Sequence, residues 1–201
     1  IRLGSPFLRL LRETMKAHTL ALIRGLNRIL GIYRDSPRLL RGAEVGVFRG
    51  HNSADLLAHY PQLQLTMVDS GWGSEFRNKF EPSDVEKEAR EKVKFAEGRH
   101  SIITTPSPQC ASEFEDEWFD FVFIDADHTY DAVKADIAAW WPKVRPNGVL
   151  AGHDYRSLMD RKGKFGVSQA VNEFVDEKRL KVEIHRGFVW IVQKYDTLSV
   201  V

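Results

Sequence analysis

The sequence has little of what defines several large protein classes. It holds one cysteine, Cys110, in 201 residues, which excludes an internal disulfide and a zinc site built on several cysteines. It has no run of about 18 apolar residues, the length that a membrane-spanning helix needs. A single thiol is typical of a reducing compartment, so we expect a cytoplasmic protein.

Net charge is also small, because 29 basic residues balance 28 acidic residues to a formal charge of +1. The chain therefore lacks the strong overall positive charge typical of many nucleic-acid-binding proteins. The charge is uneven, however. Residues 1–41 hold nine Lys and Arg against two acidic residues, and the rest of the chain carries a balance of −6. We expect no nucleic-acid partner for that acidic remainder.

The basic segment has apolar residues at helical spacing. They recur every three or four residues within two stretches: Leu8, Leu11, Met15, then Leu22, Leu26, Ile29 and Tyr33. The spacing predicts two basic amphipathic helices that break near Thr19. They suit either a cap packed on the main domain or an arm that contacts a membrane surface or a partner. Their apolar faces also suit a homodimer contact. We expect a domain boundary between this segment, 1–41, and residues 42–201.

After Arg41, short apolar runs alternate with helical patterns, which is typical of a parallel α/β sheet. The expected strands are 43–48, 63–69, 93–98, 119–127, 149–155, 181–186 and 188–194. The last two are expected to pair antiparallel. We therefore predict an α/β fold: a Rossmann-like, seven-stranded, mostly parallel sheet with helices on both faces, preceded by an N-terminal helical segment. The loop at 70–83 is rich in glycine and aromatic residues and is a candidate lid.

Polar residues follow the predicted strands, and ligands of open parallel sheets bind at the carboxyl ends of the strands. In chain order these residues are Gly46, Arg49, Gly50, His51, Asn52, Asp69, Glu97, Gly98, Asp125, Asp127, His128, His153 and Asp154. Gly46 and Gly50 would let the backbone approach a ligand closely. Their G-x-x-x-G spacing differs from G-x-G-x-x-G and disfavours a dinucleotide. Asp69 is suited to the hydroxyls of a ribose.

Three stretches carry a family resemblance: EVGVFRGHNS at 44–53, MVDSG at 67–71 and FDFVFIDADHTYDAVKADIAAWWPKVRPNGVLAGHDY at 119–155. They resemble class I S-adenosylmethionine-dependent methyltransferases, in particular the O-methyltransferase-like group with I-D-x-D-H after the fourth strand and G-x-H-D after the fifth. The resemblance implies an enzyme that transfers a methyl group from S-adenosylmethionine to the hydroxyl of a small molecule, such as a sugar, a phenol or a natural product.

The resemblance also implies positions for the cofactor. Glu44 would hold the methionine amino group, the glycine turn would pass under the methionine and the ribose, and the turn after the third strand would lie near the adenine. The implied cofactor-binding residues are Glu44, Gly46, Val47, Gly50, Ser53, Asp69, Ser70, Gly98 and Asp125.

Two devices could deprotonate the acceptor hydroxyl. A divalent cation such as Mg²⁺ on Asp125 and Asp154 would lower the pKa of the hydroxyl, as the resemblance to metal-dependent enzymes implies. Tyr155 stands where catechol-type enzymes carry Asn, which leaves the third ligand to Asp127, His128 or His153. Alternatively, His128 or His153 could accept the proton. The expected catalytic residues are Asp125, His128 and His153.

The remaining histidines, His18, His59, His100 and His185, are expected to be structural. Two other functions stay open on the sequence alone. One is a non-catalytic relative that binds the cofactor or a partner, and the other is a nicotinamide-dependent oxidoreductase on the same fold. A nucleic-acid methyltransferase is disfavoured further because no Asn-Pro-Pro-Tyr-type stretch follows the fourth predicted strand.

Overall fold

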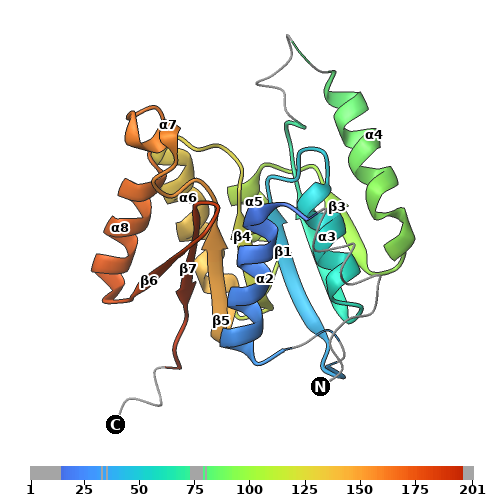
Figure 1. Cartoon of the computed structure of the whole chain (residues 1–201), viewed down its shortest axis with the longest axis horizontal. Helices are drawn as coiled ribbons and strands as arrows, with labels where there is room; N and C mark the ends of the chain where they lie inside the picture. The colour runs from blue at the N-terminus through green and yellow to red at the C-terminus, as the bar shows by residue number, and fades with distance from the viewer. Residues whose placement is uncertain (1–14, 33, 35, 73–78, 80, 197–201) are drawn as a thin grey trace.

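A computed structural model of the chain describes residues 15–32, 34, 36–72, 79 and 81–196. Its centre is a seven-stranded sheet in the order β3-β2-β1-β4-β5-β7-β6 (Figure 1). The strands are β1 (Leu40–Val45), β2 (Leu63–Val68), β3 (His100–Ile103), β4 (Phe119–Ile124), β5 (Val144–Gly152), β6 (Val182–His185) and β7 (Val189–Gln193). Strands β1 to β5 pair in parallel, and β7 pairs antiparallel with β5 and β6. The predicted fold class is confirmed.

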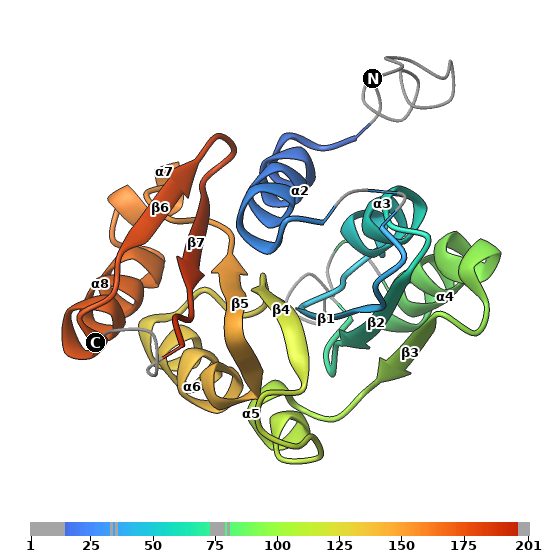
Figure 2. The ribbon, with the colours of Figure 1, turned by 90° about the horizontal axis from the view of Figure 1, so that it is seen from below.

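Helices cover both faces of the sheet (Figure 2). One face carries α2 (Ala17–Leu30), α3 (His51–His59) and α4 (Pro82–Val93), and the other carries α5 (Ser107–Ala111), α6 (Tyr130–Trp140) and α8 (Val167–Lys178). The short elements are η2 (Lys94–Ala96), η3 (Trp141–Lys143) and α7 (Leu158–Arg161). Every residue of β4 is buried, as expected for a central strand with helices on both sides.

Helix α2 is part of this core. Its Leu22 and Leu26 are fully buried, and the helix packs against β5 and β7. The predicted break near Thr19 is wrong, because Thr19 is a buried residue inside α2. The first predicted helix, with Leu8 and Leu11, lies outside the described residues. Among the residues that are described, no helix is long and apolar enough to cross a membrane.

The predicted third strand at 93–98 is wrong. Helix α4 runs to Val93 and η2 follows directly, so β3 begins only at His100. Val85, Ala89 and Val93 are buried at a spacing of four residues, which shows that this apolar run closes the core face of a helix. Gly98 therefore precedes β3 instead of following it.

Two other expected segments can be compared with the structure. β5 begins before the expected strand at 149–155: residues 145–148 already lie inside it, where the pairing with β4 shifts register. Half of the candidate lid at 70–83, residues 73–78 and 80, lies outside the described part of the chain. Its Trp72 is 4% exposed and packs in the core on the α3–α4 face.

Candidate functional site

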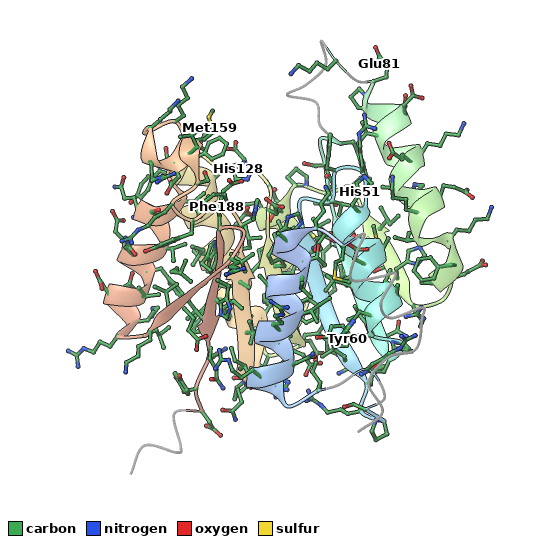
Figure 3. All side chains as sticks on the ribbon, in the orientation of Figure 1. His51, Tyr60, Glu81, His128, Met159 and Phe188 are labelled. Atoms are coloured by element: carbon green, nitrogen blue, oxygen red, sulfur yellow. The ribbon has the colours of Figure 1, made fainter. Side chains whose placement is uncertain are left out.

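Two aspartates and two histidines meet at the carboxyl ends of β4 and β5. His128 Nε2 lies 3.3 Å from Asp125 Oδ1 and 3.1 Å from Asp154 Oδ2. His153 Nδ1 lies 3.4 Å from the same oxygen of Asp125 and 3.2 Å from that of Asp154. Each imidazole therefore bridges both carboxylates. We call these four residues the Asp–His cluster; in Figure 3 its His128 lies at the upper end of the molecule.

The backbone fixes the Asp–His cluster tightly. The amide of Asp125 donates to Val45 O at 2.7 Å, and the amide of His153 donates to Ile124 O at 3.1 Å. These bonds continue the sheet pairing by one residue past the ends of β4 and β5. Asp154 has φ 61°, in the left-handed region that non-glycine residues seldom adopt. Such backbone strain is common at functional sites, and here it belongs to the turn that presents Asp154 to the histidines.

Charge in the Asp–His cluster is mutually stabilising. Burial alone would lower the pKa of both histidines, but hydrogen bonds and attraction from the two carboxylates outweigh it. They raise the pKa of His128 to about 9 and that of His153 to about 10. Burial would likewise raise the pKa of Asp125 and of Asp154, yet the histidines hold both below the usual range. Without a metal, the cluster at neutral pH thus consists of two carboxylates and two imidazolium ions.

Three members of the cluster could hold a divalent cation. One ligand atom each from Asp125, His128 and Asp154 lie within 4.8 Å of one another. Carboxylate oxygens suit Mg²⁺, and imidazole suits several transition metals. Asp127, another predicted ligand, instead accepts the amide of Thr129 at 2.8 Å in the turn before α6. The donor set therefore fits a cation that displaces the histidine protons.

Two residues that contact the cluster were not predicted as site residues. The ring of His18, from α2, lies 4.8 Å from that of His153, and Phe165 stacks on His128 at 4.5 Å with an interplanar angle of 16°. Burial and the neighbouring His153 cation lower the pKa of His18 to about 4, so this imidazole is neutral at about pH 7. His18 lies far from the others in sequence and outside any motif, so only tertiary packing reveals it.

The glycine turn after β1 is shaped by contacts within the chain. Gly46 has φ +89°, and a Cβ there would lie 2.2 Å from the carbonyl oxygen of Asp125. Gly50 has φ +71°, and its Cβ would lie 2.9 Å from Ala89 Cα in α4. Both glycines are therefore needed to pack the turn against β4 and α4. That they also approach a cofactor stays a prediction.

Asp69 braces the same turn. Its Oδ2 accepts the amides of Val47 and Phe48 at 2.9 and 2.8 Å, and its Oδ1 accepts those of Gly71 and Trp72 at 3.0 and 2.6 Å. Four donors fill the usual acceptor capacity of one carboxylate. Asp69 thus joins the loops after β1 and β2, and its contact with a ribose stays a prediction.

The bracing role predicts the effect of Asp69→Asn. The amide replaces one acceptor oxygen by a donor, so two backbone amides lose their partner. We expect a loss of about 2–4 kcal/mol in the free energy of unfolding, measured by urea denaturation. Ser70→Ala, at the exposed neighbouring residue, is the control and should change stability by less than about 0.5 kcal/mol. Unchanged stability of Asp69→Asn would contradict the bracing role.

Glu44 is buried beneath the glycine turn. It accepts hydrogen bonds from Asn52 Nδ2 at 3.0 Å and from the hydroxyl of Ser53. Burial raises the pKa of Glu44 to about 8. Ser53 is fully buried, and Oδ1 of the buried Asn52 has no hydrogen-bond partner in the described part of the chain. Contact of Glu44 and Ser53 with the methionine part of a cofactor stays a prediction.

The expectation that Gly98 follows a strand at the ligand-binding edge is wrong. Gly98 lies between η2 and the amino end of β3, next to Arg99, which donates to Leu57 O and Tyr60 O at the end of α3. Figure 3 shows Tyr60 at the end of the molecule opposite His128. Thr104 and Thr105 are the residues that follow β3.

Comparisons with known proteins agree with this architecture. A family described as "Methyltransferase domain" matches residues 43–155. The fold is similar to that of a Corynebacterium glutamicum protein, with 16% identity, a TM-score of 0.62 and coverage of 97% of this chain and 92% of that one. The fold is also similar to that of N-methyltransferase NodS from Bradyrhizobium japonicum, with 15% identity, a TM-score of 0.56 and coverage of 87% of this chain and 97% of that one. A search of curated proteins found no match.

A further structural relative is the MycE methyltransferase of the mycinamycin biosynthetic pathway, solved with Mg and SAH. It has 18% identity and a TM-score of 0.59, and the match covers 89% of this chain and 51% of that one. At such identities the structural likeness shows a shared fold. The family match is the stronger finding, because it covers more than half of the chain, including the glycine turn and the Asp–His cluster. The chain belongs to the methyltransferase-domain family.

Proposed function

We propose that the protein is an S-adenosylmethionine-dependent O-methyltransferase that acts on a small-molecule hydroxyl with the help of a divalent cation. The Asp–His cluster carries the proposal, because it combines oxygen ligands and imidazoles at the edge of the sheet where ligands bind. The glycine turn after β1 touches the backbone of Asp125, so a cofactor at this turn would be next to the cluster. MycE, solved with Mg and SAH, supports the same pairing of cofactor and metal.

The chain's own residues would have distinct tasks. S-adenosylmethionine supplies a methyl group activated by its sulfonium, and a divalent cation lowers the pKa of an acceptor hydroxyl. Asp125 and Asp154 would bind the cation. His128 Nε2 would either complete the ligands of the cation or, where the carboxylates alone hold the cation, accept the hydroxyl proton in its unprotonated form. Phe165 would hold the plane of that ring and restrict water on one side of it.

Calorimetry tests the cofactor. We expect S-adenosylmethionine and S-adenosylhomocysteine to bind and NAD not to bind. Binding of NAD alone would favour the oxidoreductase. Binding of S-adenosylhomocysteine without methylation of any hydroxyl in a panel of sugars and phenols would favour the non-catalytic relative. Titration with Mn²⁺, followed by electron paramagnetic resonance, tests the cation independently of activity.

The raised histidine pKa values predict how the metal-free protein responds to pH. Both histidines bind a proton more tightly in the folded state, with pKa values of about 9 and 10. Their stabilisation is thus fully present below about pH 6.5 and is lost as pH rises through 9 to 10. The pKa of Glu44 is raised from 4.5 to about 8, so its stabilisation is lost as pH rises through that range and is already lost above about pH 8. We expect the free energy of unfolding in EDTA to fall by about 3–4 kcal/mol between about pH 8 and 10.

The control for this pH effect is His128→Gln, which removes one of the two titrating groups. Its free energy of unfolding should fall less steeply over the same window. An identical slope in the variant and in the original chain would contradict the assignment. In the original chain, Mn²⁺ should bind more tightly as pH rises, because the cation competes with the histidine protons.

A further inference from the structure

A pocket of about 310 Å³ lies beside the Asp–His cluster, between the loop after β5 and the start of α8. Its lining residues are Arg156, Asp160, Arg161, Gly163, Phe165, Gly166, Ser168 and Gln169. This volume is at the lower end of the range for small-molecule sites. The family match ends at residue 155, so the pocket is formed by residues that lie beyond it.

The pocket and the cluster share walls. Phe165 lines the pocket and stacks on the ring of His128. The amide of Gly166, also in the lining, donates to His128 O at 2.8 Å, and the amide of Ser157 donates to Asp154 O at 3.1 Å. A molecule in the pocket would therefore lie next to the residues proposed to bind the cation and move the proton.

The pocket wall and rim are positively charged. Residues 156–164 contain four exposed cations, Arg156, Arg161, Lys162 and Lys164. None of them has an ion-pair partner within the part of the chain that is described. Such a cluster of unpaired cations next to a pocket favours an anionic ligand.

Asp160, the acidic residue of the lining, does not cancel this charge by pairing with an arginine side chain. Its carboxylate accepts the amide of Arg156 at 2.9 Å, the amide of Ser168 at 3.2 Å and the hydroxyl of Ser168. Asp160 thus ties the loop after β5 to the first turn of α8. Neither the guanidinium of Arg156 nor that of Arg161 is paired with a carboxylate among the described residues. The guanidinium of Arg156 lies over the ring of Tyr155, 5.4 Å from its centroid, a contact that leaves the N–H donors in the guanidinium plane for a ligand.

We propose that this pocket binds an oxyanion group of the methyl acceptor, a phosphate ester or a carboxylate, through Arg156 and Arg161. The proposal rests on the proposed function and names its substrate class. A guanidinium matches either oxyanion with two parallel hydrogen bonds. The acceptor would bind its anionic group in the pocket and extend its hydroxyl past Phe165 to the Asp–His cluster.

Exposed apolar side chains lie at the same end of the molecule. Leu158, Met159 and Phe188 are 55%, 38% and 44% exposed, and Figure 3 places Met159 and Phe188 at the same end of the molecule as His128. These side chains suit the body of an acceptor that is anionic at one end and partly apolar elsewhere. A soluble acceptor is favoured over a membrane surface because the two arginines share one small hollow with Phe165, which stacks on His128 of the cluster.

The experiment measures binding without catalysis. Inorganic phosphate, glucose 6-phosphate and acetate are titrated into the full chain loaded with S-adenosylhomocysteine, and affinities are taken from calorimetry and from amide shifts at 156–169 by NMR. We expect Arg156→Gln and Arg161→Gln each to weaken the binding of glucose 6-phosphate by about tenfold or more. Lys162→Gln and Lys164→Gln remove the same charge from residues outside the pocket lining. They should change the affinity for glucose 6-phosphate by less than about threefold. Arg161→Lys should retain part of the affinity.

The outcomes separate this proposal from the proposed function. Tight binding of a phosphate and weak binding of acetate would assign a phosphorylated acceptor, and the reverse would assign a carboxylate. Equal losses in all four neutral variants would overturn the proposal, because they would indicate bulk charge only. Binding to vesicles of anionic lipid without binding of any soluble oxyanion would also overturn it. Failure of S-adenosylhomocysteine to bind would instead count against the proposed function.

Discussion

Replacing Asp154 by Asn is expected to lower methyl transfer by about a thousandfold or more and to abolish Mn²⁺ binding. The change removes one of two carboxylates that could hold a cation, and it removes a partner from both His128 and His153. S-adenosylhomocysteine should still bind within about threefold of the original affinity, because the glycine turn is anchored by Asp69 and not by Asp154. Activity, cation binding and cofactor binding are therefore expected to separate in one variant.

The matched control is Asp127→Asn. Asp127 follows β4 in the same short segment, but its carboxylate accepts the amide of Thr129 in the turn before α6. Its activity should stay within about threefold of the original chain. If Asp154→Asn kept its activity, and EDTA left that activity unchanged, the cation would have no part in the reaction. His128 and His153 would then remain as the candidates for the base.

The sheet was predictable because its strands have local signals. The run at 119–124 is apolar except for Asp120, which pairs with Arg38 and Arg145, and the structure buries all of it, as expected for a strand covered on both sides. The third strand failed for a local reason too: the run at 93–98 joins the last apolar residue of α4 to the short helix η2. A short apolar run does not distinguish a strand from the end of a helix unless its period is followed upstream.

The site was predictable where residues directly follow a strand. Asp125, His128, His153 and Asp154 were expected at one edge of the sheet, and the structure brings their side chains within hydrogen-bonding range. His18 could not be inferred in this way, because the packing of α2 on β5 and β7 brings it there.

The sequence also predicts the position of a residue in the fold more reliably than it predicts the hydrogen-bond partners of its side chain. Asp69 was expected to face a ribose, yet in the structure its oxygens accept four backbone amides. Local sequence cannot show that the loops after β1 and β2 both direct their amides to this carboxylate. Position at a sheet edge therefore predicts a candidate, and only the surrounding donors and acceptors show what else the side chain does.

Gly46→Ala is expected to lower the free energy of unfolding by about 3 kcal/mol or more, and Gly98→Ala by only about 1 kcal/mol. The two glycines have similar φ values, +89° and +78°, so both variants carry the cost of a left-handed backbone. They differ in surroundings. A Cβ at Gly46 would lie 2.2 Å from Asp125 O and 2.6 Å from Ala126 Cα, whereas nothing lies within 4 Å of one at Gly98. The difference between the variants therefore isolates the contact between the glycine turn and the residues after β4.

The same pair of variants tests how the turn serves the site. Any relief of the clash at Gly46 must move the backbone of Asp125, so Gly46→Ala should also weaken Mn²⁺ binding and S-adenosylhomocysteine binding. Gly98→Ala should leave both unchanged, because Gly98 lies at the opposite edge of the sheet, before β3. Urea denaturation gives the two stabilities, and calorimetry gives the two affinities. Equal losses of stability would mean that backbone strain alone sets the cost at Gly46. In that case the turn and Asp125 would be free to move apart, and the glycine would not couple the proposed cofactor site to the cluster.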